Sequence, residues 1–312
     1  MTEKLKTVFR PLGHTEALLD GRVTPEGFVL DYVERPVLIK GFREMVREQS
    51  HDICELAMTT YMCARAYGKP ITAIPVFPAR GLHHGAILVH RDSGINDPRS
   101  LEGRKVGVNR GYTVTTGVWA RGILASEYGV DLSRITWVLS GDEHVAEYNA
   151  PANVISMPQG DDLAQMLKRG ELAAAIGIAA NDPDLIPLIP NPKETALDWV
   201  RQTGIYPINH TVVIRNELLE ENPNLGPAVF KAFADARSLY VGELEAGIQN
   251  PTVADLENEL IGGILGTPLP YGFEANRNVL EVLAAHAEAQ GILPAGTSIE
   301  SLFADNTLSL QA

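Results

Sequence analysis

The segment Lys105-Val106-Gly107-Val108-Asn109-Arg110-Gly111-Tyr112-Thr113-Val114-Thr115-Thr116 contains the pattern on which the fold depends. Its first four residues predict a short buried strand, its middle is a polar loop, and the apolar run from Val118 to Tyr128 predicts a helix. The same order follows at once, with a strand expected at 135–138, a helix at 161–168 and a strand at 173–176. Such alternation favours mostly parallel sheets covered by helices.

The N-terminal part of the chain repeats this alternation. Strands are predicted at 5–10, 29–33, 52–56, 71–77, 85–90 and, after a Pro-rich loop at 183–192, at 211–214. Short helices are predicted at 15–19, 41–48 and 59–67, and long amphipathic helices at 226–246 and 274–290. The C-terminal segment is therefore expected to be helical.

The length of 312 residues exceeds that of one typical compact domain and predicts two cores with a groove between them. Turn-forming residues at 93–98 mark the expected crossing from one core to the other. We expect a discontinuous first lobe of residues 1–95 plus 205–312 and a second lobe of residues 96–204. A small ligand is expected in the cleft between the lobes.

The net charge of -13 disfavours binding to nucleic acid or to an anionic membrane surface. A small anion can still be held where a few arginines gather locally. The N-terminus lacks an apolar stretch followed by a small-residue cleavage site, so a cytoplasmic location is expected. Cys54 and Cys63, placed in one helical stretch, are expected to be reduced, partly buried thiols.

Three segments lie where ligands bind in open α/β sheets, beyond the carboxyl ends of strands. They are Arg10 to Thr15, Phe77 to His84, and Arg110 to Thr115. An arginine taken alone is more often a solvated surface charge, but together the segments could hold a dicarboxylate at both ends. The candidate residues in them are Arg10, His14, Arg80, His83, His84, Arg110, Tyr112, Thr113 and Thr115.

Glu55 is a carboxylate within an apolar run, which indicates either a core salt bridge or a proton-transfer group whose pKa is raised by burial. Asn209-His210 follows a predicted turn, and His210 is a further candidate for ligand binding. Asp142-Glu143-His144 also follows a turn and is expected to be a surface loop. Metal binding by His83-His84 is disfavoured because no matching His or carboxylate spacing accompanies the pair.

The sequence contains no Gly-x-Ser-x-Gly elbow, no P-loop and no dinucleotide-binding fingerprint. Several stretches in order do resemble one known family, 4,5-dihydroxyphthalate decarboxylase and its relatives, over roughly residues 5–240. The stretches that carry the resemblance are Phe42 to Met45, Asp52 to Ala57, Ala73 to Arg80, Gly117 to Leu124, and Glu127 to Val130.

The resemblance implies an α/β, two-lobed fold of the type II periplasmic-binding-protein kind with a helical C-terminal segment. It also implies a cytoplasmic enzyme of aromatic catabolism that removes one carboxylate of its substrate as carbon dioxide, leaving a protocatechuate-like product without a cofactor. The chain departs from the family pattern at His14, at His83-His84 and at Arg110 to Thr115, which makes a related hydroxylated aromatic acid a further candidate substrate.

For that chemistry we expect a general acid that protonates the ring carbon and a group that assists the phenol. Glu55 or His84 is the expected acid, and His83 or His14 the expected assistant. Arg80, Arg110, Thr113 and Thr115 are expected to hold the carboxylate that stays.

Two other interpretations remain open. One is a solute-binding protein for a small carboxylate without chemistry, and the other is a ligand-sensing or pyrimidine-precursor protein on the same scaffold. Assistance by a divalent cation and assembly into a homo-oligomer are not decided by the sequence.

Overall fold

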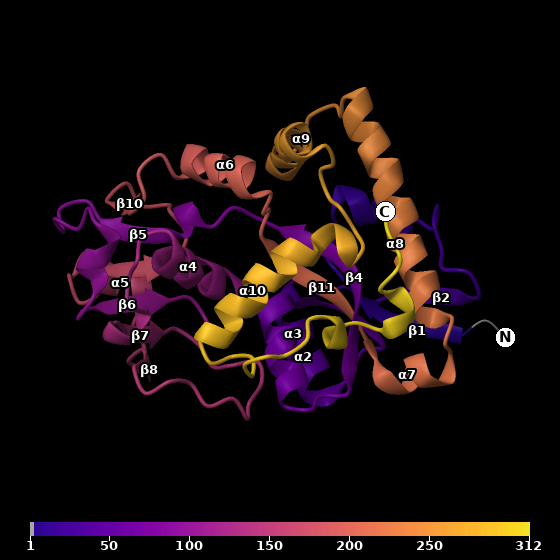
Figure 1. Ribbon diagram of the computed structural model, residues 1–312, viewed down its shortest axis with the longest axis horizontal. Coiled ribbons are helices and arrows are strands. Elements are labelled where there is room, and N and C mark those ends of the chain that lie inside the picture. The colour runs from indigo at the N-terminus through magenta and orange to yellow at the C-terminus, as the bar shows by residue number, and fades with distance from the viewer. Residues whose placement is uncertain (1–2) are drawn as a thin grey trace. The chain divides into compact units, whose positions relative to one another are not determined.

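The computed structural model describes residues 3–312, which form two compact units (Figure 1). Unit 1 consists of the described residues up to Arg80, of Ile208–Val282 and of Gly296–Ala312. Unit 2 consists of Gly81–Pro207 and Leu283–Ala295. The chain thus leaves unit 1 directly after Arg80, whereas the sequence placed the crossing at residues 95 and 96. The turn at 93–98 lies inside unit 2.

Unit 1 is built on a sheet of five strands in the order β2-β1-β3-β11-β4. These strands are β1 (Glu3–Val8), β2 (Phe28–Tyr32), β3 (Ile53–Ala57), β4 (Ile71–Arg80) and β11 (Ile208–Arg215). The helices of this unit are α1 (Glu16–Leu19), α2 (Leu38–Glu48), α3 (Met58–Ala66), α7 (Asn216–Glu221), α8 (Leu225–Ala246) and α9 (Val253–Leu265).

Unit 2 has a sheet of six strands in the order β10-β5-β9-β6-β7-β8. They are β5 (Ile87–His90), β6 (Lys105–Val108), β7 (Thr136–Leu139), β8 (Val154–Ser156), β9 (Ala174–Ile176) and β10 (Leu185–Pro187). Its helices are α4 (Thr115–Ser126), α5 (Leu163–Lys168) and α6 (Pro192–Thr203). The division between the units falls within α10 (Arg277–Ala289).

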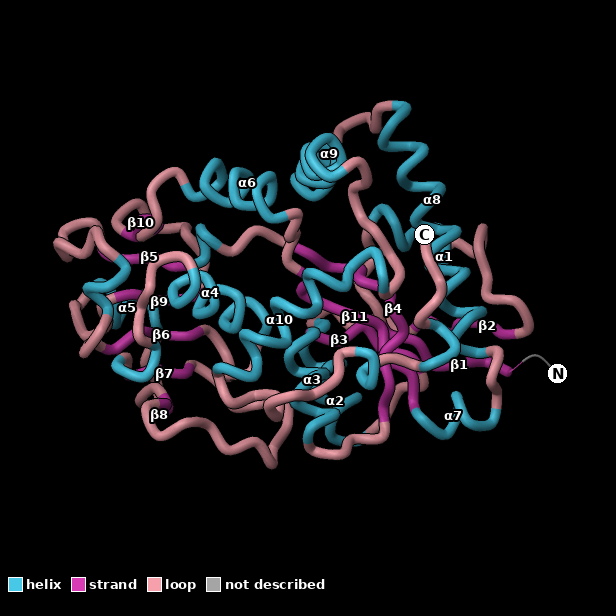
Figure 2. The backbone as a smooth tube through the Cα atoms, viewed as in Figure 1, coloured by secondary structure: helices cyan, strands magenta, loops and turns pink. Residues whose placement is uncertain are grey.

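Both sheets are mixed, which corrects the expectation of mostly parallel sheets for unit 1. β1 pairs in parallel with β2 and β3, but β11 pairs antiparallel with both β3 and β4. Figure 2 shows β3, β11 and β4 as neighbouring strands. In unit 2, β6, β7, β8 and β9 are parallel, and β5 and β10 are antiparallel. The antiparallel pairs arise where the chain enters unit 2 and where it returns to unit 1.

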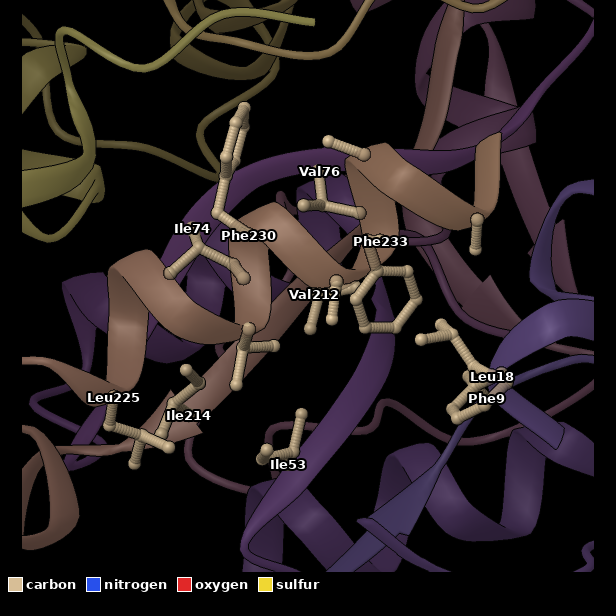
Figure 3. Packing of buried hydrophobic residues seen from close by; sticks show 14 of the residues in the cluster. Phe9, Leu18, Ile53, Ile74, Val76, Val212, Ile214, Leu225, Phe230 and Phe233 are labelled. Carbon is tan, nitrogen blue, oxygen red and sulfur yellow. The ribbon is translucent and has the colours of Figure 1, made fainter. Parts of the chain in front are cut away.

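The core of unit 1 lies between its sheet and α8 (Figure 3). Ile53, Val212 and Ile214 project from the sheet towards the apolar side of α8. Phe233 of α8 is fully buried, and its ring meets that of Phe9 edge to face at 5.5 Å between centroids. Burying one such side chain contributes about 1.5–3 kcal/mol. In unit 2, Leu163, Met166 and Leu167 of α5 share a buried hydrophobic cluster with residues of the sheet, namely Leu88, Val138 and Ala175.

No separate strand or helix was predicted for β8, β10, α6, α7 or α9, although α9 lies in the C-terminal segment that was expected to be helical. Cys54 lies in β3 and Cys63 in α3, so the two thiols do not share a helix as expected. Both are free and buried. None of the helices in residues 3–312 combines the length and the apolar character needed to cross a membrane.

Candidate functional site

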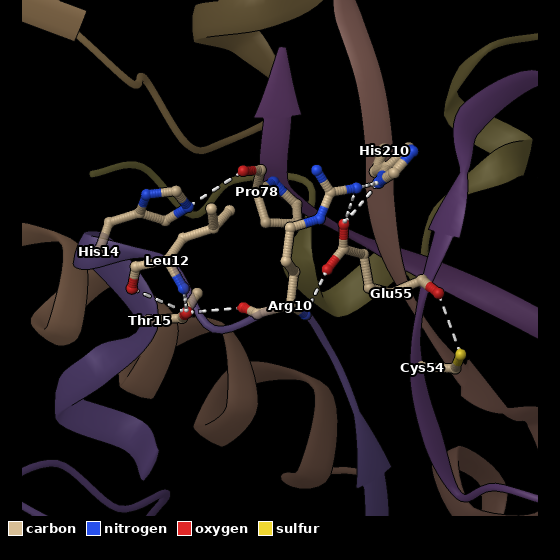
Figure 4. Close-up of polar contacts among 8 residues, drawn as sticks. All are labelled: Arg10, Leu12, His14, Thr15, Cys54, Glu55, Pro78 and His210. Carbon is tan, nitrogen blue, oxygen red and sulfur yellow. Dashed lines mark hydrogen bonds and ion pairs between the residues drawn. The ribbon is translucent and has the colours of Figure 1, made fainter. Parts of the chain in front are cut away.

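Glu55 and His210 form the centre of a polar cluster in unit 1 (Figure 4). Nδ1 of His210 lies 2.5 Å from Oε1 of Glu55. The Glu55 side chain is fully buried, whereas that of His210 keeps 14% of its surface exposed. Among the described residues, Nε2 of His210 makes no hydrogen bond. This nitrogen is therefore the part of the pair that can exchange a proton with a bound molecule.

The strand register explains why these two side chains meet. On the antiparallel pair β3 and β11, Val212 lies opposite Glu55 and His210 lies opposite Ala57. Side chains related by this diagonal point to the same face of a sheet and lie within reach of each other. The pairing of β11 with β4 is irregular on both sides of His210. Such bulges redirect side chains, and this one lies beside the buried carboxylate.

β4 can bulge here because it is the edge strand and carries Pro75 and Pro78, which have no N–H to donate. The free edge of β4 is used elsewhere, since the carbonyl of Pro75 accepts a hydrogen bond from the N–H of Gly272 at 2.8 Å. The ring of Phe42 in α2 meets the imidazole of His210 edge to face at 5.1 Å. Sheet geometry and aromatic packing together fix the orientation of His210.

Arg10 follows β1 and contributes twice to the cluster. Its backbone N–H donates to Oε2 of Glu55 at 2.7 Å, and its Nη2 lies 3.7 Å from Oε1. Nη2 also lies 3.4 Å from Nδ1 of His210, but a guanidinium only donates. Nδ1–H of the imidazole donates to Glu55, so Nδ1 cannot also accept a hydrogen bond from Arg10. The guanidinium therefore interacts with the carboxylate of Glu55 and not with the imidazole. The Arg10 side chain is 43% exposed, so its charge also faces solvent.

The pKa of Glu55 is lowered, and the expectation of a raised pKa is wrong. Burial alone acts to raise this pKa and is the largest single effect. The hydrogen bond and positive charge of His210, the charge of Arg10 and the N–H of Arg10 together outweigh it. Glu55 is therefore a carboxylate at neutral pH, which suits it to stabilise a protonated imidazole rather than to donate a proton itself.

His14 is buried in the single 3-10 turn Gly13–Thr15 that precedes α1, next to this cluster in Figure 4. Its Nε2–H donates to the carbonyl of Pro78 at 3.0 Å, and its ring meets Tyr240 edge to face at 5.8 Å. Desolvation lowers the pKa of His14 to about 4, although the charge of Glu55 acts in the opposite direction. His14 is thus a neutral imidazole at neutral pH, and its remaining nitrogen is a hydrogen-bond acceptor.

Arg80 lies at the end of β4 in unit 1, half-buried. Its Nη2 donates to the carbonyl of Pro270 at 3.0 Å and to the side-chain oxygen of Asn276. Its guanidinium also lies over the ring of Phe77, 5.6 Å from the centroid. These contacts join β4 to the segment that precedes α10, so Arg80 has a structural role, and its role in ligand binding stays a prediction.

His83 and His84 belong to unit 2, whereas Glu55 and His210 belong to unit 1. His84 is buried, with Nε2 3.0 Å from a carboxylate oxygen of Glu127 and its ring 5.8 Å from that of Trp199. His83 is also buried and stacks on Trp119 at 6.4 Å. The pair forms part of an aromatic core that joins α4, α6 and the end of α10.

The loop Arg110 to Thr115 connects β6 to α4 in unit 2 and is largely buried. Arg110 has a left-handed backbone with φ of 73°, and its N–H donates to the hydroxyl of Ser140 at 2.8 Å. The loop donors meet a carboxylate of the chain itself. The N–H groups of Tyr112 and Thr113 and the hydroxyl of Thr113 donate to Glu143. Glu143 was expected in a surface loop and is half-buried instead.

Within residues 3–312, no three His, Cys, Asp or Glu side chains gather in a way that would hold a metal ion. The polar cluster of unit 1 consists of a carboxylate, an imidazole and a guanidinium, a combination suited to proton transfer and to anion binding.

Comparison with known proteins identifies the family. The NMT1/THI5-like family model matches residues 39–241. The 4,5-dihydroxyphthalate decarboxylase of Comamonas testosteroni is 31% identical over 297 residues, covering 88% of each chain. That of Pseudomonas putida is 34% identical over 206 residues, 62% of this chain and 77% of the relative. The chain belongs to the NMT1/THI5-like family and to that of the 4,5-dihydroxyphthalate decarboxylases.

Solved structures confirm the fold expected for this decarboxylase family. The periplasmic aliphatic sulphonate binding protein SsuA from Escherichia coli superposes with a TM-score of 0.58 at 14% identity, over 99% of this chain and 100% of SsuA. The desulfurization enzyme DszB gives a TM-score of 0.55 at 14% identity, over 98% and 99% of the two chains. The periplasmic-binding-protein fold predicted from the sequence is therefore confirmed.

In this family member the residues of the polar cluster were predicted from the sequence, but the contacts between them were not. Glu55, Arg10 and His210 were all candidates, yet the pairing of His210 with Glu55 was not foreseen. The signal that could have suggested it is that the polar His210 immediately precedes Thr211 to Ile214, which were predicted to form a strand. That run predicts a strand able to lie beside the strand of Glu55.

Proposed function

We propose that the protein is a non-oxidative decarboxylase of a hydroxylated aromatic dicarboxylate of the 4,5-dihydroxyphthalate type, with a protocatechuate-like product. Membership of the decarboxylase family supports the reaction class. The observation that carries the proposal is the buried, ionised Glu55 bonded to a partly exposed His210. In this pair the imidazole of His210 is the proton source, and the carboxylate of Glu55 holds the imidazole in one orientation.

His210, rather than Glu55, is the proposed proton donor. Its Nδ1–H is held by Glu55, so a proton on Nε2 is directed away from the buried carboxylate. When the imidazole is protonated, its positive charge is balanced by Glu55 across 2.5 Å. Glu55 is a positioning residue in this scheme, because it acts on the substrate through the imidazole.

The reaction begins when His210 transfers the Nε2 proton to the ring carbon that carries the departing carboxylate. The hydroxyl para to that carbon passes its proton to Nδ1 of His14 as the ring becomes a dienone. The bond from the ring to the carboxylate carbon then breaks, its electron pair restores the aromatic ring, and carbon dioxide leaves. The phenol regains its proton, and His210 is reprotonated from solvent. One proton is consumed for each carbon dioxide released.

His14 is proposed as the hydrogen-bond acceptor for the phenol. Its neutral state follows from a pKa of about 4, and Nε2–H is already committed to Pro78. The acceptor is thus Nδ1. A neutral imidazole with this low basicity favours a hydrogen bond to the hydroxyl and does not compete with His210 as an acid.

The carboxylate that stays on the product is proposed to bind arginine and loop donors. Arg10 is the cation nearest to the Glu55 and His210 pair, and it is partly exposed. Arg80, Arg110, Tyr112, Thr113 and Thr115 remain proposed ligand contacts on the basis of their sequence positions. We expect the departing carboxylate to occupy a less polar position, since strong pairing there would stabilise the ground state.

The test is a comparison of three acids with the purified full-length chain. We expect carbon dioxide and protocatechuate from 4,5-dihydroxyphthalate, slower release from 4-hydroxyphthalate, and none from phthalate, which lacks the para hydroxyl. Each reaction is followed by carbon dioxide trapping and by chromatography of the aromatic product. No turnover of any hydroxylated acid, together with a thermal shift caused by one of them, would favour the solute-binding alternative and reject the enzyme.

A further inference from the structure

The turn Gly111 to Thr113 in unit 2 binds a carboxylate that belongs to the chain. The hydroxyl of Thr113 donates to Oε2 of Glu143 at 2.6 Å, and the N–H of Thr113 donates to the same oxygen at 3.2 Å. The N–H of Tyr112 donates to Oε1. Both carboxylate oxygens are therefore bound in the manner expected of a receptor for a carboxylate ligand.

A buried positive charge lies directly behind this turn. Arg121 in α4 is fully buried, and within residues 3–312 it forms no ion pair. Its Nη2 donates to the carbonyl of Tyr112 at 2.6 Å, and Nε donates to Gln290 at 2.7 Å. The guanidinium carbon lies 3.8 Å from the centroid of the Tyr112 ring.

One end of this guanidinium is unsatisfied, since Nη1 of Arg121 has no hydrogen-bond partner among the described residues. A buried charge without an ionic partner is costly unless something compensates it. The neighbouring carboxylate of Glu143 acts on Arg121 electrostatically. A negative charge at the turn therefore stabilises the buried guanidinium, whichever molecule supplies that charge.

The backbone of the turn is shaped for a close approach of this carboxylate. A side chain at Gly111 would place its Cβ 2.6 Å from Oε2 of Glu143, so only glycine leaves the required space. The preceding residue, Arg110, is held in the left-handed region with φ of 73°. L-residues rarely adopt this conformation, and it persists where the surroundings demand it.

Glu143 itself is supplied by the connection between β7 and β8. Its neighbours Gly141, Asp142, Ala146 and Glu147 are exposed. The segment also contains the buried His144, Val145 and Tyr148, so Glu143 lies where a connection anchored in unit 2 alternates with exposed residues. Two carboxylates at the same donors would repel each other, so an incoming carboxylate must replace Glu143 rather than join it.

We propose that the turn Gly111 to Thr113 is a carboxylate subsite for an aromatic acid, that Glu143 occupies it in the ligand-free protein, and that ligand binding displaces Glu143. The inference rests on the proposed function only for the class of ligand. Displacement keeps one negative charge next to Arg121 and makes Glu143 an internal competitor. The apparent affinity of the ligand is therefore lower than that of the open subsite.

The test is calorimetric titration with phthalate, which the proposed reaction does not consume. Removing the competitor in Glu143→Ala is expected to tighten phthalate binding by roughly tenfold, which corresponds to about 1.4 kcal/mol. Glu143→Gln, which keeps the size but loses the charge, is expected to tighten binding less. Glu147→Gln changes a neighbouring carboxylate and is expected to leave the affinity at its wild-type value.

A further substitution locates the subsite. In the Glu143→Ala background, Gly111→Ala places a methyl group where the carboxylate lies and is expected to reverse the gain. The proposal is overturned if both Glu143 variants remain folded and bind phthalate no more tightly than the wild type, because Glu143 is then only a structural tie. Decarboxylation is assayed separately. Tighter binding by the variants without any turnover by the wild type would reject the enzyme and retain the subsite.

Discussion

His210 and Glu55 meet across adjacent antiparallel strands at 2.5 Å, although 155 positions separate them in the sequence. The side chain of Glu55 is fully buried, and its two partly exposed side-chain partners are His210 and Arg10. His210 is the partly exposed member of the pair. Because a guanidinium does not release its proton at neutral pH, proton transfer that uses the negative charge of Glu55 is expected to proceed through the imidazole.

Replacing His210 by Gln should abolish most of the activity without unfolding the protein. Loss of a positioned general acid typically lowers turnover by about 10²–10⁴-fold. We expect a fall in kcat within that range, measured by carbon dioxide release under saturating substrate. His90→Gln changes a half-buried histidine of β5 in unit 2 and should leave kcat unchanged. Equal loss in both variants would count against a specific role for His210.

Glu55→Gln should reduce both turnover and the pH dependence of stability. The folded-state pKa of Glu55 is lowered below its ordinary value of 4.5. Its contribution to stability is therefore fully present above that pH and is lost as the pH falls through the folded-state pKa. The variant should unfold more easily at pH 7 and show a flatter acid limb, both measured by urea unfolding at several pH values. An unchanged acid limb would show that Glu55 is not the group responsible.

Because His14 is buried in its neutral form, the free energy of unfolding should fall when the solution is made mildly acidic. Its folded-state pKa is about 4 against an ordinary value of 6.5, so between these values the unfolded chain binds a proton that the native chain does not. Stability should fall as the pH drops through this window, by up to about 3 kcal/mol for this group. His14→Gln should remove that part of the slope, as measured by urea unfolding from pH 4 to 7. His90→Gln should retain the wild-type slope if His14 is the cause.

Phe233→Ala should weaken unit 1 strongly. The side chain is fully buried between α8 and the sheet, and it contacts Phe9. Removing such a ring leaves a cavity and typically costs about 3–5 kcal/mol. Leu239→Ala on the same helix changes a side chain that is 44% exposed and should stay within about 0.5 kcal/mol of the wild type. The free energy of unfolding from urea titration distinguishes the two outcomes.

Much of the fold could be predicted from local pattern. The strand at 105–108 and the helix after it were found because apolar runs and the intervening glycine are local signals. The helix α6 was missed because Pro192 in a Pro-rich stretch suggested a loop, although proline fits the first turn of a helix. α9 lies in the segment that was expected to be helical, but its bounds were not predicted, although the capping box of Thr252 and Asp255 marks its start.

The candidate site was predicted only as separate residues. Burial of Glu55 follows from its apolar neighbours, but the direction of its pKa shift depends on partners from β1 and β11 that no local pattern identifies. His83 and His84 were predicted to face the ligand because they are adjacent histidines. In the structure the ring of His83 contacts Trp119 and the ring of His84 contacts Trp199. The cleft between the lobes, the cytoplasmic location and the homo-oligomer stay predictions.

The position of β11 in the sheet has a consequence for how the chain is synthesised. β11 lies between β3 and β4, but it is translated only after all of residues 81–207. Until then β3 and β4 lack the strand that joins them, and their unpaired backbone groups are open to wrong partners. On the ribosome, the sheet of unit 1 therefore stays incomplete while unit 2 is synthesised, and its open strand edges are exposed throughout that interval.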